Sequence, residues 1–452
     1  METVGANLNA APCTLDKLEG AARPSDIATS TPGKPRMNIL LSAFAFAPGT
    51  GSEPGVGWNF AMMLNRAGHQ VTVLTKPHSR HEILAALAAD PALARIRVEF
   101  VGSRPPQLIH RVRLFHQVYY LFWQVLALKA AKRLHRAQPF DIAHAVTTSG
   151  IRFPSFLGAL QIPFLLGPIG GGETMPPQLR RTLPPVHRLA EFARSLSTAL
   201  LSLDPLMRRT FRSATVILAR TADTASAIGK AHQQKVRQTF GIGIEPETIV
   251  PAPRRLNRGP RGDFRILFVA RLVYWKGGDL ALAAVARAAA SLPEASLTVV
   301  GRGPERQHLH RRAEELGIAT RVIWRHDWMD ARDLERLYEE HDVMLFPSMH
   351  EAGGTVVLEA FAKAMPVVCL DIGGPGQIVA GIGGDAVPTR GVPVNQIVDG
   401  LAEALVKLAL EPGIYHQRSK AAWEDARLRD WRNEVETAYS FLEKSQAARR
   451  PL

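Results

Sequence analysis

Short runs of apolar and β-branched residues alternate with longer segments of helical periodicity along most of the chain. In the first half this pattern predicts strands at residues 37–43, 71–75, 96–101, 140–146, 162–166 and 214–219. In the second half it predicts strands at residues 264–270, 296–300, 321–324, 342–346 and 366–370. Strands that alternate with helices are typical of parallel sheets with crossover helices. The sequence therefore predicts an α/β fold with two doubly wound, Rossmann-like domains.

The alternation of strands and helices stops at residues 251–262, where Pro, Arg and Gly predominate. We interpret this segment as a linker between an N-terminal domain at 37–250 and a C-terminal domain at 263–430. Residues 1–36 are rich in Ala, Thr, Pro and Ser and lack the apolar run of a signal peptide, which predicts a disordered tail. Ligands of doubly wound domains bind at the carboxyl ends of the strands, so we expect a site in the cleft between the domains.

Composition and charge limit the possible partners. The chain has 452 residues, of which 46% are hydrophobic and 21% charged, as in globular proteins. Its net charge of +14 suits nucleic acid, an anionic membrane or an anionic substrate. Cys13 and Cys369 are too far apart in sequence for a disulfide framework or a metal motif, which is consistent with a reducing, cytoplasmic compartment.

One basic segment is also rich in aromatic residues. No acidic residue occurs between Glu99 and Asp141, and the run LFHQVYYLFWQVLAL lies within this segment. The run is too short and too polar to cross a bilayer. It predicts either an amphipathic helix on a membrane surface or an ordinary helix docked on a sheet. The basic residues around it are Arg104, Arg111, Arg113, Lys129, Lys132, Arg133 and Arg136.

A second segment, residues 176–213, interrupts the strand–helix pattern of the first domain. It has helical periodicity broken by prolines, and its only acidic residues are Glu191 and Asp204. An insertion before a strand is a common position for a specificity element, although a solvated helical hairpin is the alternative. Its basic residues are Arg180, Arg181, Arg188, Arg194, Arg208, Arg209 and Arg212.

The candidate chemistry centres on the stretch HEAGGTVVLEAFAKAM in the second domain. Glu351 lies in the loop after a predicted strand, and Glu359 lies about one turn into a helix that starts near Gly354 or Thr355. Gly353 and Gly354 leave the backbone open at the helix N-terminus, which favours an anion such as phosphate. Carboxylates accept hydrogen bonds from the hydroxyls of a ribose or a sugar. The arrangement predicts a nucleotide-sugar site.

This Glu-x7-Glu pattern resembles the signature of retaining glycosyltransferases with the GT-B fold. From residue 37 to about residue 442 the chain is similar to glycosyltransferase family 4 (group 1) enzymes of polysaccharide assembly. The resemblance implies that Glu351 contacts the donor sugar and Glu359 holds the ribose hydroxyls. It also implies that Arg271 and Lys276, in VARLVYWKGG, bind the donor diphosphate. Such cations stabilise the negative charge that develops on the leaving phosphate.

A glycine-rich loop, APGTGSEPGVGW, follows the first predicted strand of the first domain. The family resemblance assigns it, particularly Gly51, to the donor phosphates and the acceptor cleft. The loop also suits a dinucleotide, and an NADP enzyme remains an alternative. In that alternative Lys76, His78 and Arg80 would bind a 2′-phosphate.

Several further residues are weaker candidates. His144 ends a predicted strand facing the cleft and is either catalytic or a buried structural histidine; relatives often carry a second histidine where this chain has Val146. Gly301 lies where the family binds the nucleotide base. The loop GPIGGGE at residues 167–173 is expected near the acceptor, and helix 431–446 resembles the segment that crosses back to the first domain. Ala364 replaces a glycine common in the family, at a cost of about 1 kcal/mol if its backbone is left-handed.

The resemblance predicts retaining, metal-independent transfer of a sugar from a UDP- or GDP-sugar to a glycan or a lipid-linked saccharide. No Asp-x-Asp motif is present, so we expect no metal and no cofactor. We expect a cytoplasmic protein that associates with the inner face of the cytoplasmic membrane and does not bind nucleic acid. A non-catalytic protein that binds membranes or polysaccharide with the same fold is a further alternative.

Overall fold

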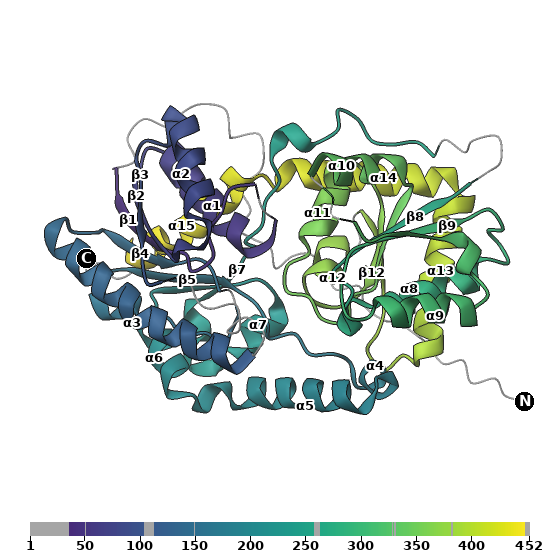
Figure 1. Ribbon diagram of the computed structural model, residues 1–452, viewed down its shortest axis with the longest axis horizontal. Coiled ribbons are helices and arrows are strands. Elements are labelled where there is room, and N and C mark those ends of the chain that lie inside the picture. Colours follow the sequence, from purple (N-terminus) through teal and green to yellow (C-terminus); the bar gives the residue numbers. More distant parts are fainter. Residues whose placement is uncertain are drawn as a thin grey trace, which may run out of the picture. The chain divides into compact units, whose positions relative to one another are not determined.

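The computed structural model describes residues 36–49, 51–103, 113–148, 150–256, 263–327, 329, 331–380 and 383–447 (Figure 1). Residues Arg36–Leu452 cluster as one compact unit. This unit contains two parallel β-sheets, and the helices pack on the sheets. The prediction of two Rossmann-like α/β domains is confirmed.

The N-terminal sheet has seven strands in the order β3-β2-β1-β4-β5-β6-β7. Every neighbouring pair is parallel. The order reverses between β1 and β4, which is where open sheets of this kind bind ligands. The strands are β1 (Asn38–Ser42), β2 (Gln70–Thr75), β3 (Ile96–Phe100), β4 (Ile142–Ala145), β5 (Phe164–Ile169), β6 (Val216–Ala219) and β7 (Val236–Gln238).

The C-terminal sheet has six strands in the order β10-β9-β8-β11-β12-β13, again all parallel. Its order reverses between β8 and β11. The sequence pattern did not predict the edge strands β7 and β13, because both are short and their side chains are not consistently apolar. The strands are β8 (Arg265–Val269), β9 (Ser296–Val300), β10 (Val322–Arg325), β11 (Val343–Phe346), β12 (Val367–Leu370) and β13 (Gly384–Val387).

The helices connect these strands. In the N-terminal half they are α1 (Ser52–Arg66), α2 (Arg80–Ala89), α3 (Arg113–Ala137), α4 (Pro177–Thr182), α5 (Pro185–Ala199), α6 (Pro205–Ser213) and α7 (Ala222–Ala227). In the C-terminal half they are α8 (Gly278–Ala288), α9 (Arg306–Glu315), α10 (Ala331–Glu340), α11 (Thr355–Ala362), α12 (Gly373–Val379), α13 (Val394–Leu410), α14 (Pro412–Leu428) and α15 (Trp431–Ala447).

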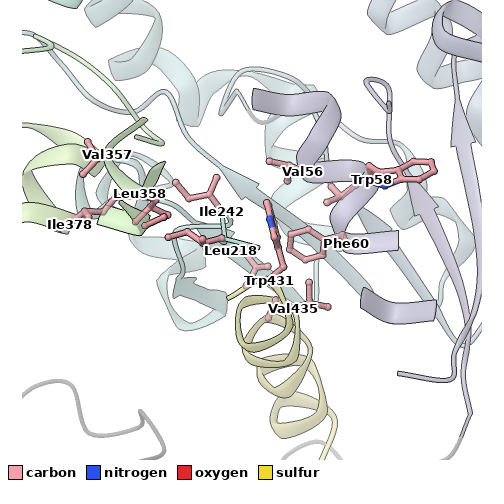
Figure 2. Packing of buried hydrophobic residues seen from close by; sticks show 14 of the residues in the cluster. Val56, Trp58, Phe60, Leu218, Ile242, Val357, Leu358, Ile378, Trp431 and Val435 are labelled. Carbon is pink, nitrogen blue, oxygen red and sulfur yellow. The ribbon is translucent and has the colours of Figure 1, made fainter. Parts of the chain in front are cut away.

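One hydrophobic cluster connects the two halves of the molecule. Its buried residues come from α1, β6, α11 and α15, among other elements. Figure 2 shows Trp431 of α15 beside Phe60 of α1, and their ring centroids are 6.3 Å apart. The last helix therefore packs against the first helix of the chain, and Leu358 of α11 belongs to the same cluster.

Helix α3 contains most of the basic, aromatic-rich segment. Tyr120 and Trp123 are buried, so one face of α3 docks in the core of the N-terminal domain. On another face Val118, Phe122 and Val125 are exposed. Residues 104–112 lie outside the described part of the chain. No helix among the described residues has the length and apolar character needed to cross a membrane.

Residues 176–213 form α4, α5, a 3₁₀ turn at Leu200–Leu203 and α6, as the proline-broken helical pattern predicts. Met175 and Leu179 are buried in the hydrophobic cluster of the C-terminal domain. This segment, which follows β5 of the N-terminal sheet, is therefore anchored in the other domain.

The backbone of Ala364 is left-handed, with φ of +52°. The side chain is fully buried. This is the conformation that a glycine adopts without strain, so the alanine costs about 1 kcal/mol at this turn. The turn lies between α11 and β12 and leaves the donor-side loop before α11 unaffected.

We predict that Val435→Ala lowers the free energy of unfolding by about 2 kcal/mol, because Val435 is 3% exposed and its methyl groups fill the cluster shared by α15 and α1. Urea denaturation measures the change. The control is Glu436→Ala on the exposed side of the same helix, which we expect to change stability by less than about 0.5 kcal/mol. Equal effects of both changes would contradict the packing of α15.

Candidate functional site

The strand order of the C-terminal sheet brings two sequence-distant loops together. β8 and β11 are neighbours, with Val343 paired to Ile266, and their following loops carry Arg271, Lys276 and Glu351. The Met349 backbone N–H donates to the Trp275 carbonyl at 2.8 Å and fixes one loop to the other. The predicted cluster at the carboxyl ends of the strands is thus formed at the point where the strand order reverses.

A glycine makes this close approach of the two loops possible. Gly277 has φ of +77°, and a Cβ at this position would lie 2.0 Å from the Pro347 carbonyl oxygen. No other residue fits without moving the loop after β11. Gly277 therefore holds the 3₁₀ turn Tyr274–Lys276 against that loop.

Lys276 and Glu351 form an ion pair between the Nζ atom and the Oε2 atom. The two side chains are 19% and 24% exposed, and the Lys276 Nζ atom lies 5.1 Å from the centroid of the Phe346 ring. Each group neutralises the other in this partly desolvated position, which avoids the cost of an unpaired buried charge. An anion arriving at Lys276 would compete with Glu351. The Arg271 side chain, from the same loop as Lys276, is exposed.

The loop that carries Glu351 leads directly into helix α11. Gly354 precedes the helix with φ of +111°, a left-handed conformation that favours glycine. Thr355 is the first helical residue, as the sequence predicts. A Cβ on Gly353 would lie 3.2 Å from Nη1 of Arg220, so the glycine also admits a neighbouring arginine. The positive end of the α11 dipole therefore follows the loop of Glu351, the partner of Lys276, directly along the chain.

A cavity of about 370 Å³ borders the N-terminal part of α11. It is lined by Gly51 and Trp58 from the N-terminal domain and by Thr355 and Glu359 from α11. Tyr338 of α10 donates its hydroxyl hydrogen to Oε2 of Glu359 at 2.7 Å. Burial raises the pKa of Glu359, and this hydrogen bond opposes the rise. The structure thus brings Gly51, Thr355 and Glu359 to one cavity, and their roles in donor binding stay a prediction.

Gly301 has a structural role. It follows β9 with φ of +139°, and a Cβ there would lie 1.9 Å from the Ala270 carbonyl oxygen. Only a glycine permits this contact between the loop after β9 and the loop that carries Arg271. His326 bonds the Gly301 carbonyl through Nδ1 at 2.9 Å. The base-binding role assigned to Gly301 stays a prediction.

His144 lies away from the residues described above. Its side chain is fully buried on β4, and its ring contacts Phe60 and Tyr439. Nε2 lies 2.6 Å from the Gly167 carbonyl, so Nε2 carries the proton and Nδ1 accepts from the Tyr439 hydroxyl at 3.1 Å. Burial lowers the pKa of His144 to about 4. Both ring nitrogens have partners within the protein, which favours the structural alternative for this histidine.

Arg220, which sequence reasoning missed, follows β6 of the N-terminal sheet. Its side chain is 7% exposed, Nε donates to the Pro168 carbonyl at 3.4 Å, and Nη2 has no partner among the described residues. Burial lowers its pKa, and surrounding carboxylates including Glu351 oppose the change. The sequence contained one signal for this residue, since Arg220 directly follows the apolar strand VILA. The N-terminal domain thus directs a buried cation toward the Glu351 loop.

The loop GPIGGGE at residues 167–173 of the N-terminal domain touches the loop that carries Glu351. A Cβ on Gly170 would lie 2.3 Å from the Cβ of Ala352. Next to it, the buried Glu173 carboxylate accepts hydrogen bonds from the Gly171 N–H and the hydroxyls of Thr221 and Thr224. Sequence reasoning expected this loop near an acceptor, and it lies against the donor-side glutamate. Among the described residues, no group of three or more His, Cys, Asp and Glu side chains is placed to hold a metal ion.

The sequence of the chain is similar to those of known glycosyltransferases. Residues 254–423 match the model of the family described as glycosyl transferases group 1. The D-inositol 3-phosphate glycosyltransferase of Mycobacterium bovis is 27% identical over 448 residues, covering 92% of this chain and 85% of that protein. Glycogen synthase of Mycobacterium tuberculosis is 29% identical over 251 residues, covering 52% of this chain and 57% of that protein. The match thus spans little more than half the length of the glycogen synthase.

A solved structure shows the same fold. HepE from Anabaena, in complex with UDP-glucose, superimposes with a TM-score of 0.55 at 18% identity. The match covers 91% of this chain and all of that one. The GT-B fold implied by the sequence resemblance is confirmed.

We predict that lowering the pH from 7.5 to 5 destabilises the protein through His144. The unfolded imidazole takes up a proton below pH 6.5, whereas the folded one stays neutral down to about pH 4. This difference in pKa stabilises the folded state fully above pH 6.5, and about 2 kcal/mol of that stabilisation is lost at pH 5. The measurement is urea denaturation of the wild type and His144→Gln at both pH values.

The comparison with His144→Gln is needed because the contribution of Glu434 to stability changes with pH in the opposite direction. Burial raises the pKa of Glu434 to about 7, so its contribution to stability falls as the pH rises. The wild type should lose about 2 kcal/mol more than His144→Gln between pH 7.5 and 5. The same loss in both proteins would show that His144 is accessible to protons in the folded state.

Proposed function

Because residues 254–423 carry a group 1 glycosyl transferase domain, we propose that this protein transfers a sugar from a nucleotide sugar to an acceptor hydroxyl with retention of configuration. The observation that supports this function best is the Lys276–Glu351 pair at the point where the C-terminal strand order reverses. Glu351 of this pair lies in the loop that leads into α11, and Glu359 lies about one turn into that helix.

The proposed donor is a UDP- or GDP-sugar that lies along the N-terminus of α11. The ribose hydroxyls bind Glu359 in the cavity, which also contains Gly51 and Thr355. The diphosphate lies at the positive end of the α11 dipole, where Lys276 and Arg271 contribute positive charge. Glu351, released from Lys276, accepts hydrogen bonds from the sugar hydroxyls. The binding of UDP-glucose by HepE, which has the same fold, supports a nucleotide sugar as the donor.

The proposed reaction needs no nucleophile from the protein. The bond between the anomeric carbon and the β-phosphate oxygen breaks, and its electron pair goes to the phosphate. The acceptor hydroxyl oxygen attacks the anomeric carbon from the same face and passes its proton to that phosphate oxygen. Lys276, Arg271 and the α11 dipole stabilise the charge that develops on the leaving group, so the reaction requires no metal. Closure of the cleft over the donor limits hydrolysis.

The proposed acceptor is a glycan or a lipid-linked saccharide of cell-surface polysaccharide or glycolipid assembly, bound by the N-terminal domain. The net charge of +14 supports a site of action at the anionic inner face of the cytoplasmic membrane. The NADP alternative gains no support from its candidate residues. The Lys76 Nζ atom lies 4.4 Å from the centroid of the Phe44 ring, and Arg80 covers the ring of Phe100.

We predict that a UDP- or GDP-sugar raises the melting temperature of the wild type and that Glu359→Ala removes most of this shift. The reason is that Glu359 is the acceptor for the ribose hydroxyls in the cavity. Thermal denaturation with a panel of nucleotide sugars measures the effect. The control is Glu340→Ala, an exposed carboxylate at the end of α10. If no nucleotide sugar stabilises the wild type, the donor assignment is wrong.

We predict that Lys276→Met lowers the rate of sugar transfer by about 10²-fold or more, because it removes a cation from the leaving phosphate. The measurement is the rate of nucleotide release with saturating donor, with Lys407→Met on the exposed surface of α13 as the control. EDTA should leave the wild-type rate unchanged. A rate for Lys276→Met close to that of the wild type, or loss of wild-type activity in EDTA, would contradict the proposed chemistry.

A further inference from the structure

Helix α5 exposes its apolar side to solvent. Seven large hydrophobic side chains of α5 and the residues after it are between 39% and 75% exposed. Within α5, Val186, Leu189, Phe192 and Leu196 recur every three or four residues, which places them along one side of the helix. The other three follow in the 3₁₀ turn and at the start of α6. An ordinary surface helix turns such a stripe toward the core. We call these residues the α5 stripe: Val186, Leu189, Phe192, Leu196, Leu200, Leu203 and Leu206.

The polar side of α5 faces the protein and contacts the loops of the candidate site. Glu191, which is buried, accepts from the Tyr274 hydroxyl at 2.8 Å, and its Oε1 lies 3.0 Å from Nε2 of His350. The ring of His187 stacks on Tyr274 with centroids 4.1 Å apart. Arg194 donates to the carbonyl of Gly171 at 3.3 Å.

These contacts fix the orientation of α5. Tyr274 begins the turn that ends at Lys276, and His350 immediately precedes Glu351. Turning the α5 stripe inward would break the hydrogen bonds of Glu191 with Tyr274 and His350. The stripe therefore faces outward because the polar side of the helix binds the loops of the candidate site. In Figure 1 α5 lies at the lower edge of the described chain, between α4 and α6.

The segment that carries the α5 stripe is rich in arginine. Between residues 174 and 213 the acidic residues are Glu191, which is buried, and Asp204, which accepts from backbone N–H groups at the start of α6. A stripe of apolar side chains bordered by arginines complements a surface that is anionic outside and apolar beneath. The exposed arginines of this segment are Arg181, Arg188, Arg208, Arg209 and Arg212.

We infer that the α5 stripe docks the protein on the surface of a bilayer that contains anionic lipids. The apolar side chains enter the boundary between headgroups and acyl chains, and the arginines bind lipid phosphates. A second copy of the chain is a poorer occupant, because two such faces would bring their arginines together and each chain carries a net charge of +14. The docked helix holds the loops of Lys276 and Glu351 on its other side, close to a lipid-linked acceptor.

The exposed side of α3 borders the same surface. Leu121 of α3 and Leu200 of the α5 stripe line one depression of about 470 Å³. Val118 and Phe122 of α3 are exposed as well. α3 alone, however, buries its main apolar face in the core, whereas α5 directs its whole apolar face outward. We therefore assign the main contact to α5.

The test is co-sedimentation of the full chain with vesicles of phosphatidylcholine, with and without phosphatidylglycerol. We expect the wild type to bind the anionic vesicles at least about tenfold more strongly than the neutral ones, and less so as salt rises. The triple variant Leu189→Ser, Phe192→Ser, Leu196→Ser should lose about tenfold or more of this binding. Its melting temperature should equal that of the wild type, because the three side chains are exposed.

Two control variants localise the contact. Ile323→Ser with Leu410→Ser removes exposed apolar residues of the C-terminal domain and should leave binding unchanged. Val118→Ser with Phe122→Ser on α3 should reduce binding less than the α5 change. The inference is overturned if the triple variant binds like the wild type, or if the wild type binds neutral and anionic vesicles equally. Light scattering that shows a dimer in the wild type and a monomer in the triple variant would instead assign the stripe to a second copy.

The placement of the acceptor at the membrane rests on the proposed function, but vesicle binding does not. The triple variant should retain the melting-temperature shift caused by a nucleotide sugar, because no residue of the α5 stripe lines the cavity of Glu359. Loss of vesicle binding with a normal shift supports docking by α5. Wild-type vesicle binding without any shift would leave the docking surface standing and contradict the proposed donor.

Discussion

The candidate site depends on one electrostatic constraint, the pairing of Lys276 with Glu351 at the ends of two adjacent parallel strands. Neither charge is well solvated, so each needs a counter-charge, and the strand order of the sheet supplies it. Gly277 allows the two loops to touch, and Gly354 ends the second loop at the N-terminus of α11. A donor diphosphate can replace Glu351 as the partner of Lys276, which frees the carboxylate for the sugar.

The N-terminal domain contributes to this constraint through polar contacts. Arg220 approaches the backbone at Gly353, and Gly170 leaves room for Ala352. Helix α5 adds Glu191, which bonds the residues that flank the ion pair. Because these contacts use the polar side of α5, its apolar side stays outside. The exposed stripe and the order of the donor-side loops therefore have the same physical origin.

Much of the fold and the donor side could be predicted from the sequence. Strands such as β6 and β11 are uniformly apolar, and the Glu351 and Glu359 pattern marks a helix start that the structure places at Thr355. The short strand β13 could not be predicted, and the sequence could not decide between a catalytic and a buried structural His144, because both depend on packing between distant segments. The sequence also could not show which side of α5 is buried, since an amphipathic period is the same whichever side faces the core. Arg220 was overlooked although its position after a strand was visible.

The measurement that tests the central claim most directly is a crystal structure of the protein with bound UDP or GDP. We predict the ribose hydroxyls on Glu359 and the diphosphate between the N-terminus of α11 and Lys276, with the ion pair to Glu351 broken. A nucleotide bound instead at Lys76 and Arg80, without contact to Glu359 and with the Lys276–Glu351 pair intact, would contradict the account.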